Sequence, residues 1–299
     1  MAELNNMREE TGVTGKRKGG FFHDIAHEFK KNKGAMVGLV ILALIIIIAI
    51  VSLFLLDYKD QIIKINILEA LKAPSVKHPF GTDQFGRDIL LRILYGAHYS
   101  LLIGLCAVFV SVLVGSTLGI LAGYYGGLTE TIIMRIMDVI SPIPSVLLAI
   151  CIATAFGQSL IVLMLAVGII SVPSFARVAR AGVLTVRDQE YIEAAKAIGA
   201  NDAQIIIHHV LPNALSPIMV QATMRVASAI ISASSLSFLG LGVPAPMPEW
   251  GGMLSEGRNF ISTNSYMTLF PGIAIMITVL SINLIGDGVR DAMDPRLKR

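Results

Sequence analysis

The sequence predicts an all-α polytopic membrane protein. Of its 299 residues, 54% are hydrophobic and only 15% are charged. Soluble domains carry about 25% charged residues, so this chain has too little charge to cover a water-exposed surface. Six apolar stretches come close to the roughly 20 residues that a spanning helix needs: 35–56, 98–122, 136–157, 160–180, 214–240 and 267–286. We therefore expect six transmembrane helices.

Residues 1–34 are expected to form an N-terminal segment that ends in a short interfacial helix. Five apolar residues fall close to one helical face and are flanked by basic residues, as in helices that lie on a membrane surface: Phe21, Phe22, Ile25, Ala26 and Phe29. The apolar stretch that follows is longer than the roughly 7–15 residues of a cleavable signal peptide. We therefore expect an uncleaved first span.

Two features predict how the later spans pack. Gly115, Gly119 and Gly123 recur four residues apart in the second span. Small residues at this spacing let two helix backbones approach closely, within one chain or between chains. The third and fourth spans are separated only by residues 157–159, which predicts a tight helical hairpin.

The distribution of Lys and Arg predicts the orientation. If both ends of the chain are cytoplasmic, sixteen of the 24 Lys and Arg residues lie on the cytoplasmic side and seven lie outside. Cytoplasmic loops carry the excess of positive charge, so this orientation is favoured. It places the 57–97 loop outside, and it places residues 181–213 and the 288–299 tail in the cytoplasm.

Most chemical signatures are missing from the sequence. It contains no GxxxxGK[ST] phosphate loop and no GxSxG nucleophile motif, so we expect no catalytic residue and no ATP site in this chain. His23 and His27 lack a third metal ligand, and the adjacent His208 and His209 point about 100° apart on a helix, so no metal site is expected. The net charge of +3 is small and gives no indication of a nucleic-acid partner, so none is expected. The basic residues fall in short clusters beside apolar runs, which favours a lipid bilayer as the partner.

Arg225 lies near the middle of the fifth span. A charge at that depth costs about 3 kcal/mol even on insertion scales, so its side chain should face protein or a wet cavity. We expect either a residue of a translocation pathway that meets an anionic group of the cargo, or a structural pair or a snorkelling side chain. The spans contain no equivalent acid, because Asp138 and Asp287 fall near predicted cytoplasmic ends, and this disfavours an ion-coupled carrier.

The polar segment 190–213, EYIEAAKAIGANDAQIIIHHVLPN, predicts a helix, a turn and a second helix. Glu190 to Ile198 is rich in helix formers, and Gly199 can provide a left-handed cap. Asn201 or Asp202 can cap the second helix, and Leu211-Pro212 is expected to end it. Such a rigid unit at the membrane surface suits docking into a groove of a partner protein.

These residues carry a resemblance. Glu193-Ala194-Ala195, Gly199 and Leu211-Pro212 resemble the EAA loop of ABC importer permeases, and four further stretches are similar to C-type subunits of the dipeptide/oligopeptide group: 78–104, 138–150, 236–242 and 248–258. The chain departs from the family at two positions. His209 stands where the family pattern has Ile, and Ala233 stands where it often has an acid.

The resemblance implies a type I ABC importer permease fold with cytoplasmic coupling helices. A permease domain would cover 98–287, after a first helix and outside loop at 35–97. The EAA loop would couple to an ATPase through Glu193, Ala194, Ala195, Gly199, Asn201, Asp202, Leu211 and Pro212. The implied partners are a homologous second permease subunit, two ABC ATPase subunits that bind ATP and magnesium, and an extracytoplasmic substrate-binding protein.

The implied cargo is short peptides, imported across the cytoplasmic membrane. Three alternatives remain at this stage: import of nickel or another metal chelate by the same architecture, an ion-coupled secondary carrier, and a polytopic membrane enzyme.

Overall fold

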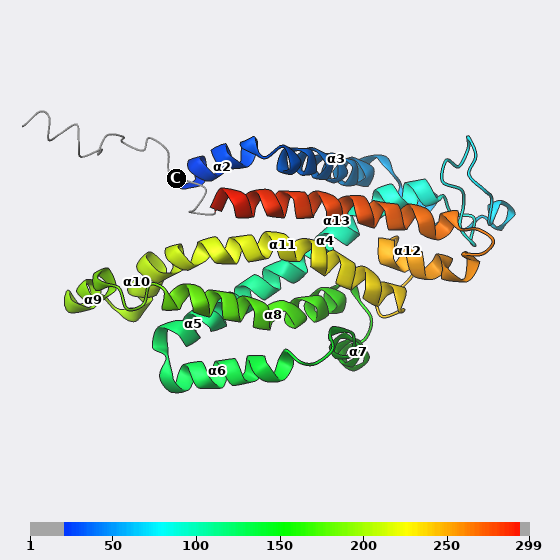
Figure 1. Cartoon of the computed structure of the whole chain (residues 1–299). Coiled ribbons are helices and arrows are strands. Elements are labelled where there is room, and N and C mark those ends of the chain that lie inside the picture. The colour runs from blue at the N-terminus through cyan, green and yellow to red at the C-terminus, as the bar shows by residue number, and fades with distance from the viewer. Residues whose placement is uncertain (1–20, 294–299) are drawn as a thin grey trace, which may run out of the picture.

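The protein, described by a computed structural model over residues 21–293, is a bundle of helices (Figure 1). The α-helices are α2 Phe21–Lys31, α3 Lys33–Leu55, α4 Ile89–Ser111, α5 Thr117–Tyr125, α6 Gly127–Ile140, α7 Ser145–Phe156, α8 Leu160–Leu184, α9 Glu190–Ala197, α10 Asp202–Ile205, α11 Leu211–Phe238, α12 Trp250–Gly257 and α13 Tyr266–Met293. Within this range 5 helices are long and apolar enough to cross a membrane, or 6 if the bent pair α6 and α7 counts as one span. The all-α polytopic fold class is confirmed.

Some helices extend beyond the predicted apolar stretches. The second span begins at Ile89 rather than at 98, because the side chain of Asp88 accepts a hydrogen bond from the Leu91 amide and caps the helix. A π-helical turn joins α4 to α5 in one 37-residue helix. The last helix continues to Met293, so it enters the predicted 288–299 tail. Hydropathy marks the lipid-embedded part of a helix and misses its polar ends.

The third predicted span is wrong as a single straight helix. Residues 127–140 form α6, residues 145–156 form α7, and the two helices bend by 92° at the break between them. Pro142 and Pro144 lie in this break, where each removes a backbone donor and disfavours the helical conformation of the residue before it. The predicted hairpin is therefore also wrong. Residues 157–159 do connect α7 to α8, but α7 has only 12 residues and is not a full membrane span.

The glycine stripe packs against α8 of the same chain. A Cβ on Gly115 would lie 2.7 Å from the carbonyl oxygen of Val172, and one on Gly119 would lie 2.2 Å from that of Ala176. A Cβ on Gly123 would lie 2.8 Å from Cβ of Val183. The stripe therefore lets the backbones of two helices touch within one subunit, which the sequence left open.

The N-terminal helices pack along α13 (Figure 1). A Cβ on Gly38 would lie 2.6 Å from the carbonyl oxygen of Ser281, so α3 approaches α13 closely. The predicted helix before the first span is present as α2, but residues 1–20 and the side chains of Phe21 and Phe22 lie outside the description, as do residues 294–299. The outward side of α3 exposes aliphatic side chains: Val37, Val40, Leu44, Ile47 and Val51. This face suits lipid.

Candidate functional site

The EAA-like segment projects from one end of the bundle, where Figure 1 shows α9 and α10 beyond the ends of α8 and α11. Its first helix ends as predicted. Gly199 has a φ of +85°, the Gly199 amide donates to the Lys196 carbonyl at 3.0 Å, and the Ala200 amide donates to the Ala195 carbonyl at 3.1 Å. These bonds make a Schellman cap, which satisfies the last carbonyls of α9 and fixes the direction of the chain.

The second helix is capped by Asn201, one of the two predicted candidates. The Asn201 side chain accepts a hydrogen bond from the Gln204 amide at 2.8 Å, and the Gln204 side chain accepts from the Asn201 amide at 3.0 Å. Asp202 instead accepts a hydrogen bond of 2.8 Å from the Tyr124 hydroxyl at the end of α5. The projecting segment is therefore tied to the bundle by a side chain that lies far away in the sequence.

The prediction that Leu211-Pro212 ends the second helix is wrong. A π-helical turn over residues 206–210 joins α10 to α11, and residues 202–238 form one 37-residue helix. Pro212 lies at the start of α11, where the wider π turn replaces the regular hydrogen-bond ladder that a proline would interrupt. Movement of the projecting segment can therefore pass directly into a membrane helix.

The EAA residues divide between the interior and the surface. Ala195 is buried, together with Ile192 and Ile205, and these three side chains hold the segment against the bundle. Glu193 and Ala194 are exposed. The side chain of Ile198 is 85% exposed, and the sequence analysis did not single it out. The sequence feature that could have identified Ile198 is its place as an apolar residue directly before the capping Gly199.

The two histidines of this segment do not belong to a cluster of metal-ligand side chains within residues 21–293. His208 is exposed and His209 is partly buried, and no group of three or more His, Cys, Asp or Glu that could hold a metal occurs within residues 21–293.

Arg225 is bonded to a neutral partner. Its Nη2 donates to Oγ of Ser174 on α8 at 2.9 Å, and Nε2 of Gln221, one turn earlier on α11, donates to the same oxygen at 2.9 Å. Arg225 forms no ion pair with any carboxylate of the described residues. The side chain is partly exposed. Within residues 21–293, the positive charge of Arg225 therefore has no neutralising acid.

Ala233, the second departure from the family pattern, is 2% exposed. It is packed in the core of this chain, so an acid at this position would face the interior of the subunit.

The opposite end of the bundle holds a buried charge cluster that the sequence analysis missed. Arg87 Nε contacts Asp83 Oδ2 at 2.5 Å, and its Nη2 contacts Glu256 Oε2 at 2.7 Å. Arg92 bonds to the same two carboxylates. The cluster ties the 57–88 loop to α12. In the sequence, the cluster is indicated only by the close spacing of Asp83, Arg87 and Arg92. Glu256 lies far away in the sequence and joins the cluster through the tertiary structure.

Glu249 lies behind this cluster at the start of α12. It is 1% exposed, and its carboxylate accepts hydrogen bonds from the Gly251 and Gly252 amides, both at 2.8 Å. Burial raises the pKa of Glu249 above its ordinary value, although these two amides oppose the shift. The side chain is a helix cap that holds α12 against α4 and α11.

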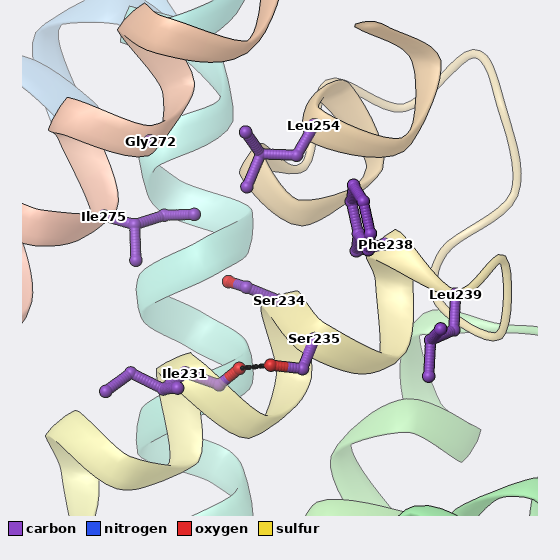
Figure 2. Close-up of a pocket in the computed structure, with 8 residues that line it drawn as sticks. All are labelled: Ile231, Ser234, Ser235, Phe238, Leu239, Leu254, Gly272 and Ile275. Carbon is purple, nitrogen blue, oxygen red and sulfur yellow. Dashed lines mark hydrogen bonds between the residues drawn. The ribbon is translucent and has the colours of Figure 1, made fainter. Parts of the chain in front are cut away.

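A pocket of about 440 Å³ lies at this end between α11, α12 and α13. Figure 2 shows Phe238 and Leu254 on one side and Ile231 and Ile275 on the other, with the hydroxyl of Ser235 turned back onto the Ile231 carbonyl. The eight lining residues contain no ionisable side chain, so the pocket offers no general acid or base. Such a surface is suited to contact with apolar groups and not to acid–base catalysis.

The chain is similar to known transport proteins along nearly its whole length. The profile of the family described as "binding-protein-dependent transport system inner membrane component" matches residues 115–299, and that of the "N-terminal TM domain of oligopeptide transport permease C" matches residues 20–74. The dipeptide transport system permease protein DppC of Alkalihalophilus pseudofirmus is 49% identical over 91% of this chain and 88% of its own length. The glutathione transport system permease protein GsiD of Escherichia coli O157:H7 is 43% identical over 93% of this chain and 91% of its own length.

The fold is also similar to a solved transporter. A chain of the MetNI methionine ABC transporter in an inward-facing conformation aligns with a TM-score of 0.55 and 20% sequence identity, over 68% of this chain and 96% of that chain. This likeness concerns the fold alone. The family match and the identity to curated permeases together decide the assignment: the chain is a non-catalytic, multi-pass inner-membrane protein that belongs to the binding-protein-dependent ABC transport permeases, as a C-type subunit of the oligopeptide-permease group.

Proposed function

We propose that this subunit forms half of the translocation pathway of an ATP-driven importer of short peptides and couples to an ATPase through α9 and α10. The observation that carries the coupling role is the capped, buttressed helix pair that projects from the bundle and continues into α11. A rigid projection transmits a displacement, whereas a flexible loop would absorb it.

The exposed face of the segment supports docking on a partner protein. Ile198 offers an apolar tip, and Glu193 and Lys196 place charges beside it. Burial of this largely exposed isoleucine by a partner would lower the free energy of the complex, because apolar surface is removed from water. The ATPase would receive this tip in a groove, and closure of an ATPase pair would move α9 and α10 together with α11.

The remaining partners follow from the family. A homologous permease subunit would complete the pathway, two ATPase subunits would bind ATP and magnesium, and a substrate-binding protein would deliver cargo from outside. This chain itself would hold no cofactor. Both of its termini would lie in the cytoplasm, since that orientation puts α9 and α10 on the side where ATP is hydrolysed.

Short peptides are the cargo that the relatives favour. One is named for dipeptides and the other for glutathione, which is itself a tripeptide derivative. Arg225 fits such cargo because no acid of the described part of the chain neutralises its guanidinium, which can bind a carboxylate.

Uptake into proteoliposomes tests the proposal. The complex of this chain with its genetically linked permease, ATPase and binding protein should accumulate a labelled dipeptide only when ATP is inside and the binding protein is outside. Uptake that follows an ion gradient and continues without ATP would instead show a secondary carrier. As a matched pair, Ile198→Asp should reduce peptide-stimulated ATP hydrolysis and uptake, whereas Ile47→Ala on the lipid-facing side of α3 should leave both unchanged.

A further inference from the structure

Two groups of hydrogen-bonded polar side chains, about one turn apart on α8, connect this helix to α11 and to α6. On α8, the Ser174 hydroxyl accepts from Arg225 and Gln221 of α11. One turn further along α8, Arg177 contacts Asp138 of α6 at 3.5 Å and donates to the Ser141 hydroxyl at 2.7 Å. We call these six residues the polar track: Asp138, Ser141, Ser174, Arg177, Gln221 and Arg225.

The polar track lies within the thickness of the bilayer. It includes Asp138, which the sequence placed near a cytoplasmic end but which lies about 16 Å along α6 from Gly127. At 1.5 Å per residue, Ser174 is about 21 Å from the Leu160 end of α8, and Arg225 is about 21 Å from the Leu211 end of α11. The hydrocarbon core of a bilayer is about 30 Å thick, so neither level is close to a helix end. The track is therefore surrounded either by lipid, by protein or by water.

Lipid is excluded by exposure and charge. The side chains of Arg177 and Asp138 are 45% and 61% exposed in the isolated chain, and charges that face acyl chains cost several kcal/mol. The aliphatic face of α3 lies on the opposite side of the bundle from α6 (Figure 1). α6 itself exposes apolar side chains, Leu128, Ile132, Ile136 and Val139, so the unfavourable contact with lipid is confined to the charged side chains of the track.

Water fits the polar track better than a dry protein contact does. Two arginines and one aspartate give the track a net positive charge. Within residues 21–293, Arg225 uses one of the five donors that a guanidinium carries, in a bond to a neutral hydroxyl. A dry subunit contact would leave that charge buried without a partner, which is strongly destabilising. A hollow of about 280 Å³, lined in part by Asp138 and Arg177, already adjoins the track.

We infer that the polar track is the wet wall of the translocation pathway, and that its unneutralised positive charge holds the carboxylate end of a passing peptide. Ser174 is the positioning residue that aims Arg225, and the Arg177–Asp138 pair extends the polar wall toward α6. The inference rests on the proposed function, since it names the face of the subunit that the cargo touches.

Thiol labelling tests the wall without requiring transport. In the complete complex in lipid nanodiscs, with Cys106 and Cys151 replaced by serine, single cysteines are introduced by Ser171→Cys and Ser228→Cys. These positions lie one turn from Ser174 and from Arg225, toward the end of the bundle opposite α9 and α10. The matched control is Ile47→Cys on the lipid-facing side of α3. The labelling rates of two methanethiosulfonates of similar size are compared, one carrying a sulfonate and one a quaternary ammonium. Each rate is divided by the rate at which the same reagent reacts with a free thiol in solution.

The wet wall predicts that both track cysteines react at least about 10-fold faster than Ile47→Cys, and that the anionic reagent is preferred because a positive wall concentrates anions. Arg225→Gln should reduce that preference, and a saturating dipeptide should slow the labelling. Rates as slow as that of Ile47→Cys would overturn the wet wall. Fast labelling without charge preference and without protection by dipeptide would overturn the role in holding cargo.

The outcome is separable from that of the proposed function. Absence of ATP-dependent peptide uptake in the unmodified complex refutes the importer proposal, whereas the labelling rates report water and charge whether or not peptide is the cargo.

Discussion

The Tyr124 hydroxyl donates a hydrogen bond of 2.8 Å to the carboxylate of Asp202, which lies 78 residues later in the chain. Tyr124 closes α5 and Asp202 opens α10, so this bond joins the second span to the projecting segment. Lys196 of α9 lies over the same ring at 5.6 Å, and Arg187 donates to the neighbouring Gly123 carbonyl at 3.0 Å. The end of α5 is therefore the support on which the coupling segment rests.

Removal of this bond should loosen the support without unfolding the bundle. Tyr124→Phe is expected to lower the free energy of unfolding by about 0.5–1.5 kcal/mol, the net value of a typical intramolecular hydrogen bond. Thermal unfolding in detergent measures the loss, and a double-mutant cycle with Asp202→Asn should show that the two changes are not additive. Tyr125→Phe at the exposed neighbouring position is the control, and equal effects of the two tyrosine variants would contradict the assignment.

The cap at Gly199 makes a prediction that depends only on backbone conformation. No atom lies within 4 Å of a Cβ placed there, and φ is +85°, so Gly199→Val is expected to cost about 1–2 kcal/mol through left-handed strain alone. Peptide uptake per ATP hydrolysed should fall while the complex still assembles. Gly199→Asn is the matched variant, because asparagine tolerates this conformation. A valine variant with unchanged uptake would remove the cap from the coupling mechanism.

The close packing of α5 on α8 predicts opposite effects for one substitution at two glycines. In Gly119→Ala the new Cβ would lie 2.2 Å from the Ala176 carbonyl oxygen, and such overpacking costs about 1–3 kcal/mol. In Gly272→Ala the nearest atom would be a Leu254 methyl at 3.9 Å, so the higher helix propensity of alanine should stabilise by about 0.5–1 kcal/mol. Midpoints of thermal unfolding that move in the same direction would show that the contact is not tight.

The buried cap Glu249 predicts a dependence of stability on pH. Burial raises the pKa of Glu249 in the folded protein above its unfolded value. Its contribution is therefore complete below the unfolded pKa of about 4.3 and declines as pH rises through the folded pKa. Glu249→Gln keeps an acceptor for the two amides and removes the titration. The fall in thermal midpoint as pH rises above the unfolded pKa should be smaller in this variant, and parallel pH profiles of the two proteins would contradict the prediction.

Several features of the fold and the site could be predicted because their signals are local. Long apolar runs identified the first, second, fourth, fifth and sixth membrane helices, and the cap at Gly199 followed from a glycine after a run of helix formers. The break between α6 and α7 was not predicted, although Pro142 and Pro144 mark it. Average hydropathy stayed high across the prolines and concealed the break. Pro212 had the opposite effect: it led to the prediction of a helix end, but a π turn accommodates this proline and the helix continues.

The sequence by itself determined that this chain crosses a membrane, that residues 190–213 form a capped helix pair, and which transport family the chain resembles. Those conclusions depend on composition, on helix periodicity and on short motifs, all of which act over a few neighbouring residues. Only the tertiary structure decided that the glycine stripe packs on α8, that Tyr124 supports Asp202, and that Arg225 shares Ser174 with Gln221 beside the Arg177–Asp138 pair. These contacts join residues many turns apart in the chain, and their partners are selected by how the helices pack rather than by any local preference.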